Sequence, residues 1–235
     1  MRGTKGQSVV EDYVKVIYSH TEWQPEPITT SVLAARLGLA ASSVTEMVKK
    51  LANAALVTHV PYGAVELTPE GTRLALRMLR RHRLIETWLV EVFDYAWDEV
   101  HDEAEVLEHT LSDRLLDAIA MQLGEPSRDP HGDPIPTADG RVSRPDAVVL
   151  RDAREGAVGY VVRISDRDPT LLRYLLAEAI TLDVQITVLG RKPFGGALAV
   201  KVGAVEHDLG DEAAASIWIS TVEPPAISGV PLETL

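Results

Sequence analysis

The segment TSVLAARLGLAASSVTEMVKKL, residues 30–51, decides the fold of the amino-terminal part of the chain. Thr30 and the serine after it are a capping signal for a first short helix, and Gly38 marks its end. Ser42 and Ser43 can cap a second helix, in which apolar residues recur at helical spacing. Two short helices joined by a tight turn that contains glycine are typical of a helix-turn-helix, so this segment predicts DNA binding.

The flanking segments extend this prediction to a winged helix. Residues 8–19 carry apolar side chains on one stripe and predict a preceding helix, which a loop with two prolines ends at residues 24–27. Apolar residues alternate with polar ones over residues 56–67 and predict a two-stranded hairpin, or wing. Tyr62 at its tip is a candidate contact to the DNA backbone or minor groove, although an ordinary surface turn places an aromatic residue in the same way.

A helical region follows the wing. Thr68-Pro69 opens a long helix that is expected to continue to Phe93, because threonine caps well and proline fits the first turn. Two further helices are predicted at residues 100–111 and 112–123, and residues 125–146 predict a linker rich in proline, glycine and aspartate. The apolar residues of the last helix form either a dimer surface or intramolecular core; they are Leu115, Leu116, Ile119 and Met121.

The carboxy-terminal part predicts a small β-barrel, which makes the whole chain an α+β protein. Its short apolar runs are bounded by turn residues, and one helix, residues 170–179, interrupts them. The predicted strands are residues 147–150, 157–164, 183–189, 198–202 and 216–222. The predicted domains are residues 1–73 for DNA binding, 74–146 for metal binding and dimerisation together with the linker, and 147–235 for the barrel.

Composition narrows the possible function. The chain has 235 residues and no cysteine, which excludes disulfides, thiolate zinc sites and cysteine nucleophiles. No window is apolar enough to cross a membrane, and the first twenty residues are unlike a signal peptide, so a cytoplasmic protein is expected. The net charge of −12 is unevenly distributed. Residues 1–83 carry 11 Lys and Arg against 7 Asp and Glu, which favours an amino-terminal part that faces DNA.

The segment HDEAEVLEH, residues 101–109, predicts a metal site. His101, Glu105, Glu108 and His109 would project from one face of a helix, where acids and imidazoles repel one another unless a cation lies among them. His82 and Glu86 on the preceding helix form a second pair of ligand type. Pairs of Glu and His four residues apart also occur on ordinary solvated helix faces, so the spacing leaves this simpler interpretation open.

Small polar and charged residues surround the apolar stripe of the second helix of the helix-turn-helix. Such side chains reach base edges and phosphates in DNA complexes. The candidates for DNA contact are Ser42, Ser43, Thr45, Glu46, Lys49 and Lys50. Capping is the alternative role of the two serines, and Glu46 can either accept from a cytosine amine or face solvent. One such unit reads too few base pairs for specificity, so a homodimer on palindromic double-stranded DNA is expected.

These motifs together resemble the diphtheria-toxin-repressor family of iron-dependent and manganese-dependent regulators. The resemblance rests on the order of helix, helix-turn-helix and wing, and on RRHRLIETWL, VHDEAEVLEHTLSD and DPHGDPIP, which begin at residues 80, 100 and 129. It covers essentially the whole chain. For residues 147–235 it implies an SH3-like, FeoA-type domain, matched in layout only.

The resemblance also implies which residues bind metal. The primary regulatory metal would lie among Asp12, Glu105, Glu108 and His109. An ancillary site would use His82, Glu86 and His101, with Asp168 of the barrel as an additional ligand. Iron-responsive members tend to have Met and Cys at the positions of Asp12 and Glu105, so two carboxylates there favour Mn(II). Fe(II) is the alternative, since His101 and the barrel are typical of iron-type members, and Co(II) or Zn(II) can substitute in vitro.

The sequence departs from the family pattern in three respects. Lys15 stands where two-domain manganese regulators have a further carboxylate, so their second-metal arrangement is not expected. Leu171 stands where iron-type members have a glutamine that ligates metal. The family's anion site would place Arg83 against Asp129 and Asp133, which are poor partners for an anion, so no anion is predicted.

The sequence therefore predicts a metal-dependent transcriptional repressor, rather than an enzyme, that controls metal homeostasis. Neither a membrane nor a small organic substrate is expected among its partners. A metal-dependent hydrolase is the alternative from another class, but the chain has no nucleophile motif, no HExxH and no phosphate-binding loop. A winged-helix regulator that senses an organic ligand, with the carboxylates as surface charge, is a third possibility.

Overall fold

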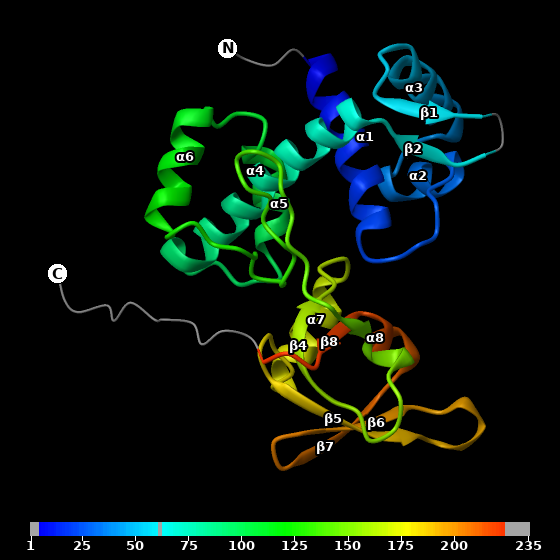
Figure 1. Cartoon of the computed structure of the whole chain (residues 1–235), viewed down its shortest axis with the longest axis vertical. Helices are drawn as coiled ribbons and strands as arrows, with labels where there is room; N and C mark the ends of the chain where they lie inside the picture. Colours follow the sequence, from blue (N-terminus) through cyan, green and yellow to red (C-terminus); the bar gives the residue numbers. More distant parts are fainter. Residues whose placement is uncertain (1–4, 61–62, 224–235) are drawn as a thin grey trace. The chain divides into compact units, whose positions relative to one another are not determined.

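The computed structural model describes residues 5–60 and 63–223, and Figure 1 traces their elements along the chain. The chain divides into two compact units. The first unit comprises Met1–Tyr95, Val100–Asp129 and Pro134–Ser143, and the second comprises Ala96–Glu99, Pro130–Asp133 and Arg144–Leu235. The predicted α+β class is confirmed, because the first unit is mainly helical and the second contains a six-stranded sheet.

The predicted winged helix-turn-helix is present in the first unit. Helix α1 (Lys5–Glu22) precedes α2 (Thr30–Leu37) and α3 (Ala41–Asn53), and the axes of α2 and α3 differ by 113°. Strand β1 (Val57–His59) pairs antiparallel with β2 (Val65–Leu67) to form the wing. Apolar residues from all five elements form one core, which fixes the outward face of α3.

The caps of α2 and α3 differ from the sequence prediction. Thr29 rather than Thr30 caps α2, and its side chain accepts a hydrogen bond from Val32 N at 3.3 Å. Gly38 ends α2 in the left-handed conformation, with φ of 64°, as its position predicted. Helix α3 starts one residue before Ser42, after a residue that makes no side-chain cap. The capping interpretation of Ser42 and Ser43 is therefore wrong, and both side chains are exposed.

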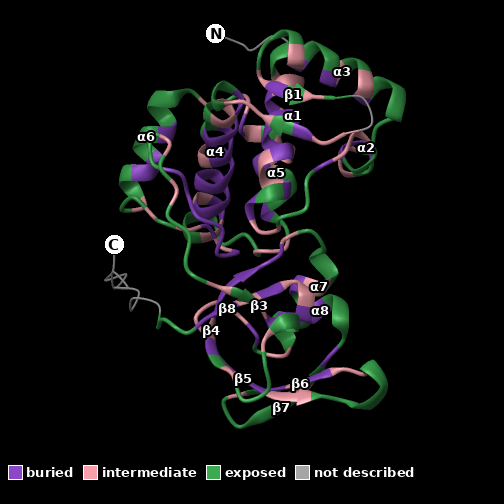
Figure 2. Ribbon diagram, turned by 45° about the vertical axis from the view of Figure 1, so that its right-hand side comes forward, coloured by how far each residue is buried: buried purple, intermediate pink, exposed green. Residues whose placement is uncertain are grey.

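Three more helices complete the first unit. Helix α4 (Pro69–Phe93) begins after the predicted cap Thr68, runs to the predicted end, and is buried along much of its length (Figure 2). Helix α5 (Val100–Leu107) is four residues shorter than predicted, because residues 108–110 form a turn. Helix α6 (Asp113–Gln122) is capped by Ser112.

The apolar residues of α6 divide between the two roles that the sequence left open. Leu116 and Ile119 are buried, and Leu116 belongs to a core shared with α4 and α5. Leu115 and Met121 are 43% and 68% exposed, so they remain available for a partner surface.

The middle of the predicted linker is packed, whereas most of residues 137–146 are exposed. Asp129, His131 and Asp133 are all buried, and Ile135 is 5% exposed within the helical core. Ile135 N donates to Ser127 O at 2.9 Å within the first unit, and Ile164 N donates to His131 O at 2.9 Å within the second. The prolines and glycines of this segment correctly predicted that it forms no helix or strand, but they did not indicate that its middle is buried.

The second unit contains one antiparallel sheet in the order β3-β8-β4-β5-β6-β7. Register shifts in the β4–β8 and β5–β6 pairs bend the sheet around its core. The sequence missed β7 and the short helix α8. The elements are β3 (Val148–Val149), η1 (Leu150–Asp152), β4 (Val158–Ile164), α7 (Pro169–Ala177), β5 (Gln185–Arg191), η2 (Pro193–Gly195), β6 (Leu198–Val202), β7 (Val205–Leu209), α8 (Asp211–Ala215) and β8 (Ile217–Ser220).

Within residues 5–60 and 63–223, no single helix is long and apolar enough to cross a membrane. The bent pair α2 and α3 meets that test by length and composition alone, and its apolar residues belong to the core of the winged helix.

Candidate metal centre and DNA-binding surface

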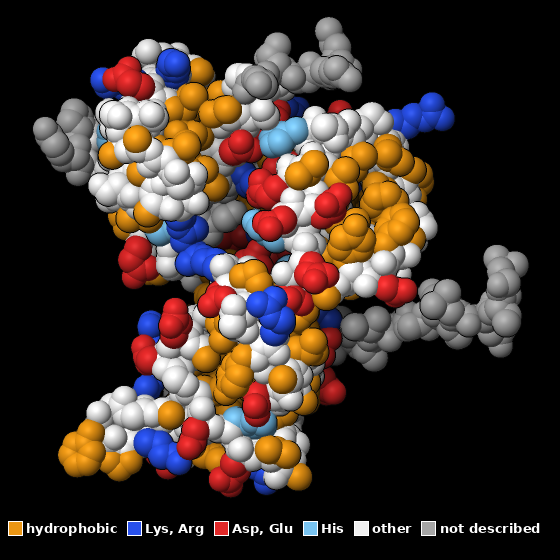
Figure 3. Space-filling view, turned by 180° about the vertical axis from the view of Figure 1, so that it is seen from behind, with side chains coloured by type: hydrophobic (Ala, Val, Ile, Leu, Met, Phe, Trp, Pro, Cys, Tyr) orange, Lys and Arg blue, Asp and Glu red, His pale blue; other side chains and the backbone are white. Residues whose placement is uncertain are grey.

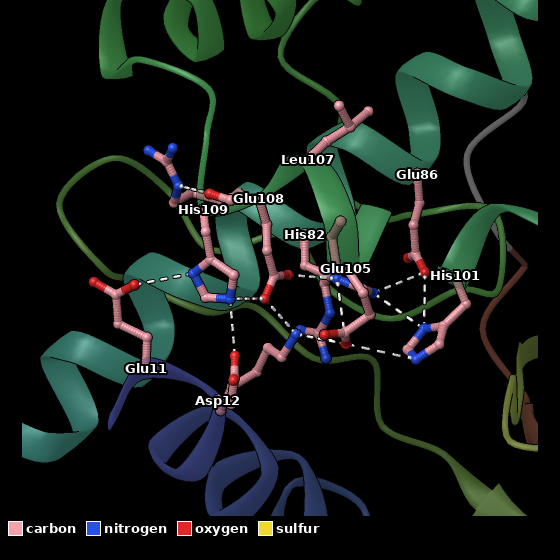
Figure 4. Close-up of polar contacts among 12 residues, drawn as sticks. Glu11, Asp12, His82, Glu86, His101, Glu105, Leu107, Glu108 and His109 are labelled. Atoms are coloured by element: carbon pink, nitrogen blue, oxygen red, sulfur yellow. Dashed lines mark hydrogen bonds and ion pairs between the residues drawn. The ribbon is translucent and has the colours of Figure 1, made fainter. Parts of the chain in front are cut away.

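Three potential metal ligands from distant parts of the sequence meet beside α1 (Figure 4). Asp12 Oδ1 lies 2.8 Å from His109 Nε2, and Glu108 Oε1 lies 3.4 Å from the same nitrogen. One ligand atom of each residue lies within 4.8 Å of the others, a spacing that suits one divalent cation. Oxygen and nitrogen donors without sulfur fit Mn(II) or Fe(II).

The end of α5 explains how Glu108 and His109 reach this position. Helix α5 ends at Leu107, so Glu108 and His109 lie in the turn after it rather than within the longer helix that the sequence predicted, and both side chains contact α1. Glu108 N still donates to Ala104 O at 2.9 Å, which fixes Glu108 at the end of the helix.

A second group of ligand type lies where α4 faces α5. His82 Nε2 lies 2.9 Å from Glu86 Oε1 and 3.2 Å from His101 Nδ1. His82 and Glu86 are buried, whereas the side chain of His101 is 46% exposed. The structure therefore brings together the three ancillary residues that the family resemblance implied.

Glu105 lies between the two groups and is engaged by a lysine. Glu105 Oε1 lies 2.7 Å from Lys15 Nζ, 3.6 Å from His101 Nε2 and 3.9 Å from His82 Nδ1. A Glu105 oxygen also forms a compact group with atoms of His82 and Glu108. The expected primary set of four is thus present in one region, with the Lys15 ammonium bound to Glu105 and Glu108.

The pKa values of the two carboxylates beside His109 shift in opposite directions. Burial raises the pKa of Asp12 above its ordinary value, and the charge of His109 offsets only part of this effect. Burial also acts on Glu108, but the hydrogen bond from His82 and the charges of His82 and Lys15 outweigh it and lower the pKa of Glu108. Glu108 is therefore an anion at neutral pH, the form that accepts a cation.

His82 bridges two buried carboxylates. Its Nδ1 lies 2.6 Å from Glu108 Oε2 and its Nε2 lies 2.9 Å from Glu86 Oε1, so both nitrogens donate when the ring is protonated. Burial alone would lower the pKa of His82, but the charge of Glu86 and the hydrogen bonds to Glu108 and Glu86 raise it to about 10. In the metal-free chain the ring is an imidazolium.

Metal-free protein is expected to lose stability as the pH rises. A pKa raised in the folded state stabilises the fold fully below the ordinary pKa of 6.5, and this contribution disappears as the pH approaches about 10. Thermal unfolding in chelator should therefore show a melting temperature that falls between pH 6.5 and 10. His82→Gln should flatten that slope. An equally steep slope in the variant would contradict the assignment.

The sequence missed two residues that hold the ligands in place. Glu11 Oε2 lies 3.1 Å from His109 Nδ1, opposite Asp12. Arg81 Nε donates to Glu108 O at 2.7 Å and its Nη1 donates to Asp113 at 2.6 Å. Glu11 stands next to Asp12 and Arg81 next to His82, so adjacency to the predicted ligands was the available signal.

Arg83, the arginine of the family's anion site, contacts other residues of the first unit. Arg83 contacts Glu22 at 2.5 Å, Asp129 at 3.7 Å and Pro134 O at 2.7 Å. Within the second unit, Asp133 pairs with Arg163 at 2.7 Å. Carboxylates of the chain itself thus neutralise Arg83.

Asp168 belongs to the second unit and caps α7. Its Oδ1 accepts hydrogen bonds from Thr170 N at 2.8 Å and Leu171 N at 3.4 Å. Leu171 packs against the core of that unit, consistent with an apolar residue that cannot bind metal.

The predicted DNA-contact residues lie on α3 outside its buried stripe. Ser42, Ser43 and Lys50 are exposed, and Thr45 is partly exposed, with its hydroxyl donating to Ala41 O at 2.8 Å. Glu46 and Lys49 form an exposed ion pair of 2.8 Å. The predicted contact by Tyr62 lies outside the described residues.

Family models cover most of the chain. Residues 7–65 match the model described as "Iron dependent repressor, N-terminal DNA binding domain", and residues 68–137 match "Iron dependent repressor, metal binding and dimerisation domain". Residues 148–221 match the FeoA domain, which confirms the predicted type of the carboxy-terminal domain.

Individual relatives give the same result. A solved structure described as a manganese-dependent transcriptional repressor in complex with manganese is 50% identical, with a TM-score of 0.87, over 91% of this chain and 100% of that chain. The diphtheria toxin repressor of Corynebacterium efficiens is 34% identical over 126 residues, 54% of this chain and 54% of that protein. This alignment therefore spans about half the length of the curated relative. The iron-dependent repressor IdeR of Mycobacterium leprae is 28% identical over 90% of this chain and 96% of that protein.

Proposed function

Since the chain belongs to the diphtheria-toxin-repressor family of metal-dependent regulators, we propose that it is a transcriptional repressor that a divalent cation activates for operator binding. The relatives named above are repressors rather than enzymes, as the sequence predicted for this chain. A repressor of this kind would act in the cytoplasm, where operator DNA is accessible.

The contact between Asp12 and His109 carries the proposal. Asp12 lies on α1, whose apolar residues belong to the core of the winged helix, and His109 follows α5. A divalent cation bound among Asp12, Glu108 and His109 would supply the charge that holds these parts together. The pose of α1 would then depend on metal, and a ligand that binds one pose more tightly shifts the population toward it.

Mn(II) is the proposed activator. The primary ligands would be Asp12, Glu105, Glu108 and His109, a set of three carboxylates and one imidazole that suits a hard cation. A relative of 50% identity is described as manganese-dependent, which supports this assignment. Fe(II) is the alternative, because other relatives are described as iron-dependent. Co(II) and Zn(II) accept the same donors and are expected to substitute in vitro.

We propose that the ancillary site uses His82, Glu86 and His101, whose ligand atoms already lie together. His82 would have to release its proton before it could ligate, so filling this site is coupled to proton release. Asp168 of the second unit stays a predicted additional ligand.

DNA recognition is proposed to use α3 in a homodimer on a palindromic operator. The contact residues would be Ser42, Ser43, Thr45, Glu46, Lys49 and Lys50. Hydrophobic side chains gather on the face of the first unit that includes α6 (Figure 3), and exposed Phe93, Leu115 and Met121 are candidates for the dimer contact. The match of residues 68–137 to a metal-binding and dimerisation domain supports this assignment.

Operator binding measured in parallel with several metals tests the proposal. An operator would first be selected from random duplex DNA in the presence of Mn(II). Fluorescence anisotropy with that duplex should then show tight binding with Mn(II) and weak binding with Mg(II) or with chelator. Activation by Fe(II) at lower free concentration than Mn(II) would assign iron instead. Equal DNA affinity with metal and with chelator would refute metal-dependent repression.

A further inference from the structure

A buried lysine lies at the centre of the primary metal site. Lys15 lies three residues after Asp12 on α1, and the residue is 6% exposed. Its Nζ donates to Glu105 Oε1 at 2.7 Å and to Glu108 Oε1 at 2.6 Å. A buried ammonium is costly unless carboxylates surround it, so these contacts account for its position.

Lys15 carries a positive charge in this environment. Burial alone would lower the pKa of Lys15, but the charges of Glu108 and Glu105 and the hydrogen bonds to both outweigh it and raise the pKa. The ammonium therefore neutralises the same acidic group that would bind a divalent cation.

Both oxygens of Glu108 already have cationic partners. Oε1 accepts from Lys15 and Oε2 accepts from His82 at 2.6 Å. An incoming cation must therefore displace one partner from Glu108 or share an oxygen with it. If Lys15 is displaced, its ion pairs are lost; if it stays, its charge repels the metal at short range. Either case weakens metal binding.

We propose that Lys15 is a tethered competing cation that sets the concentration of divalent metal needed to fill the Asp12, Glu105, Glu108 and His109 site. This inference rests on the proposed function. It assigns to Lys15 a role opposite to that of a ligand: Lys15 stabilises the metal-free chain and raises the activation threshold. It also implies that Glu105 becomes available to metal only when Lys15 releases it.

Calorimetric titration of metal-stripped protein with MnCl₂ tests this inference. Lys15→Met removes the charge but keeps much of the apolar stem, so we expect Mn(II) to bind about tenfold more tightly than to the unchanged chain. Lys15→Arg keeps the charge and should stay within about twofold. Lys201→Met, at an exposed position on β6, is the matched control and should change nothing. Unchanged or weaker Mn(II) binding to Lys15→Met would overturn the inference.

A second measurement uses the unchanged chain and so does not depend on how Lys15→Met folds. With ¹⁵N-labelled lysine, the buried Lys15 ammonium should give a resolved NMR signal in metal-free protein. One equivalent of diamagnetic Cd(II) should shift or remove that signal. Binding of Cd(II) with an unchanged Lys15 signal would overturn the inference. Failure of the unchanged chain to bind Mn(II) or Cd(II) would instead refute the proposed function, and the inference with it.

Discussion

Alanine at position 12 is expected to remove metal-stimulated operator binding while leaving the fold intact. Asp12 is the only member of the proposed primary set that α1 supplies, so its loss leaves the site without a ligand from α1, while Lys15 and Glu11 still contact Glu108 and His109. Even loss of an outer partner typically lowers metal affinity by roughly 10–100-fold, and loss of a direct ligand should cost at least that. Anisotropy with the selected operator, titrated with Mn(II), measures the effect.

Asp102→Ala is the matched control for this experiment. Asp102 is an exposed acid on α5 that belongs to neither ligand group among the described residues, so the variant should respond to Mn(II) like the unchanged chain. Circular dichroism should show the same helical content for both variants. A normal Mn(II) response of Asp12→Ala would remove Asp12 from the metal site.

Replacing Arg83 by methionine is expected to destabilise the first unit strongly. Its guanidinium contacts the carboxylate of Glu22 and lies near that of Asp129, and all three residues are buried. Removing one partner of a buried ion pair leaves uncompensated charge and typically costs about 3–5 kcal/mol. Urea unfolding of metal-free protein measures the free energy of unfolding.

Arg73→Met on the same helix provides the control. Arg73 pairs with Glu70 at the exposed start of α4, and such pairs contribute about 0–1 kcal/mol. A loss of less than about 1 kcal/mol in Arg83→Met would show that the Glu22 contact is as weak as a surface pair.

Local signals made most helix boundaries predictable. The side chains of Thr68 and Ser112 accept hydrogen bonds from backbone N–H groups three residues later, and Pro69 fits the first turn of α4. A short window of sequence therefore contains the signal for each of these helix starts. The end of α5 was not predictable in this way. The apolar pattern continues past Leu107, and only the structure shows the turn that directs Glu108 and His109 toward α1.

Long-range contacts account for what the sequence missed. Strand β7 reads VEHDL and is mostly exposed, so it lacks an alternating apolar pattern, and its pairing with β6 defines it. Lys15 and Glu108 are 93 residues apart, and Arg83 and Glu22 are 61 residues apart. Nothing near either cation in sequence indicates that it is buried or which acid neutralises it.

One uninterrupted helix joins the wing to the proposed ancillary metal site within the first unit. Helix α4 begins beside the wing and carries His82 about 20 Å further along, and no proline or glycine lies between Gly71 and Phe93 to act as a hinge. A stiff rod of that length works as a lever arm: a tilt of about 5° at the sensing end moves the other end by about 2 Å. In a symmetric homodimer the displacements of the two protomers would add. A slight reorientation would then decide whether both helix-turn-helix units match half-sites spaced about 34 Å apart.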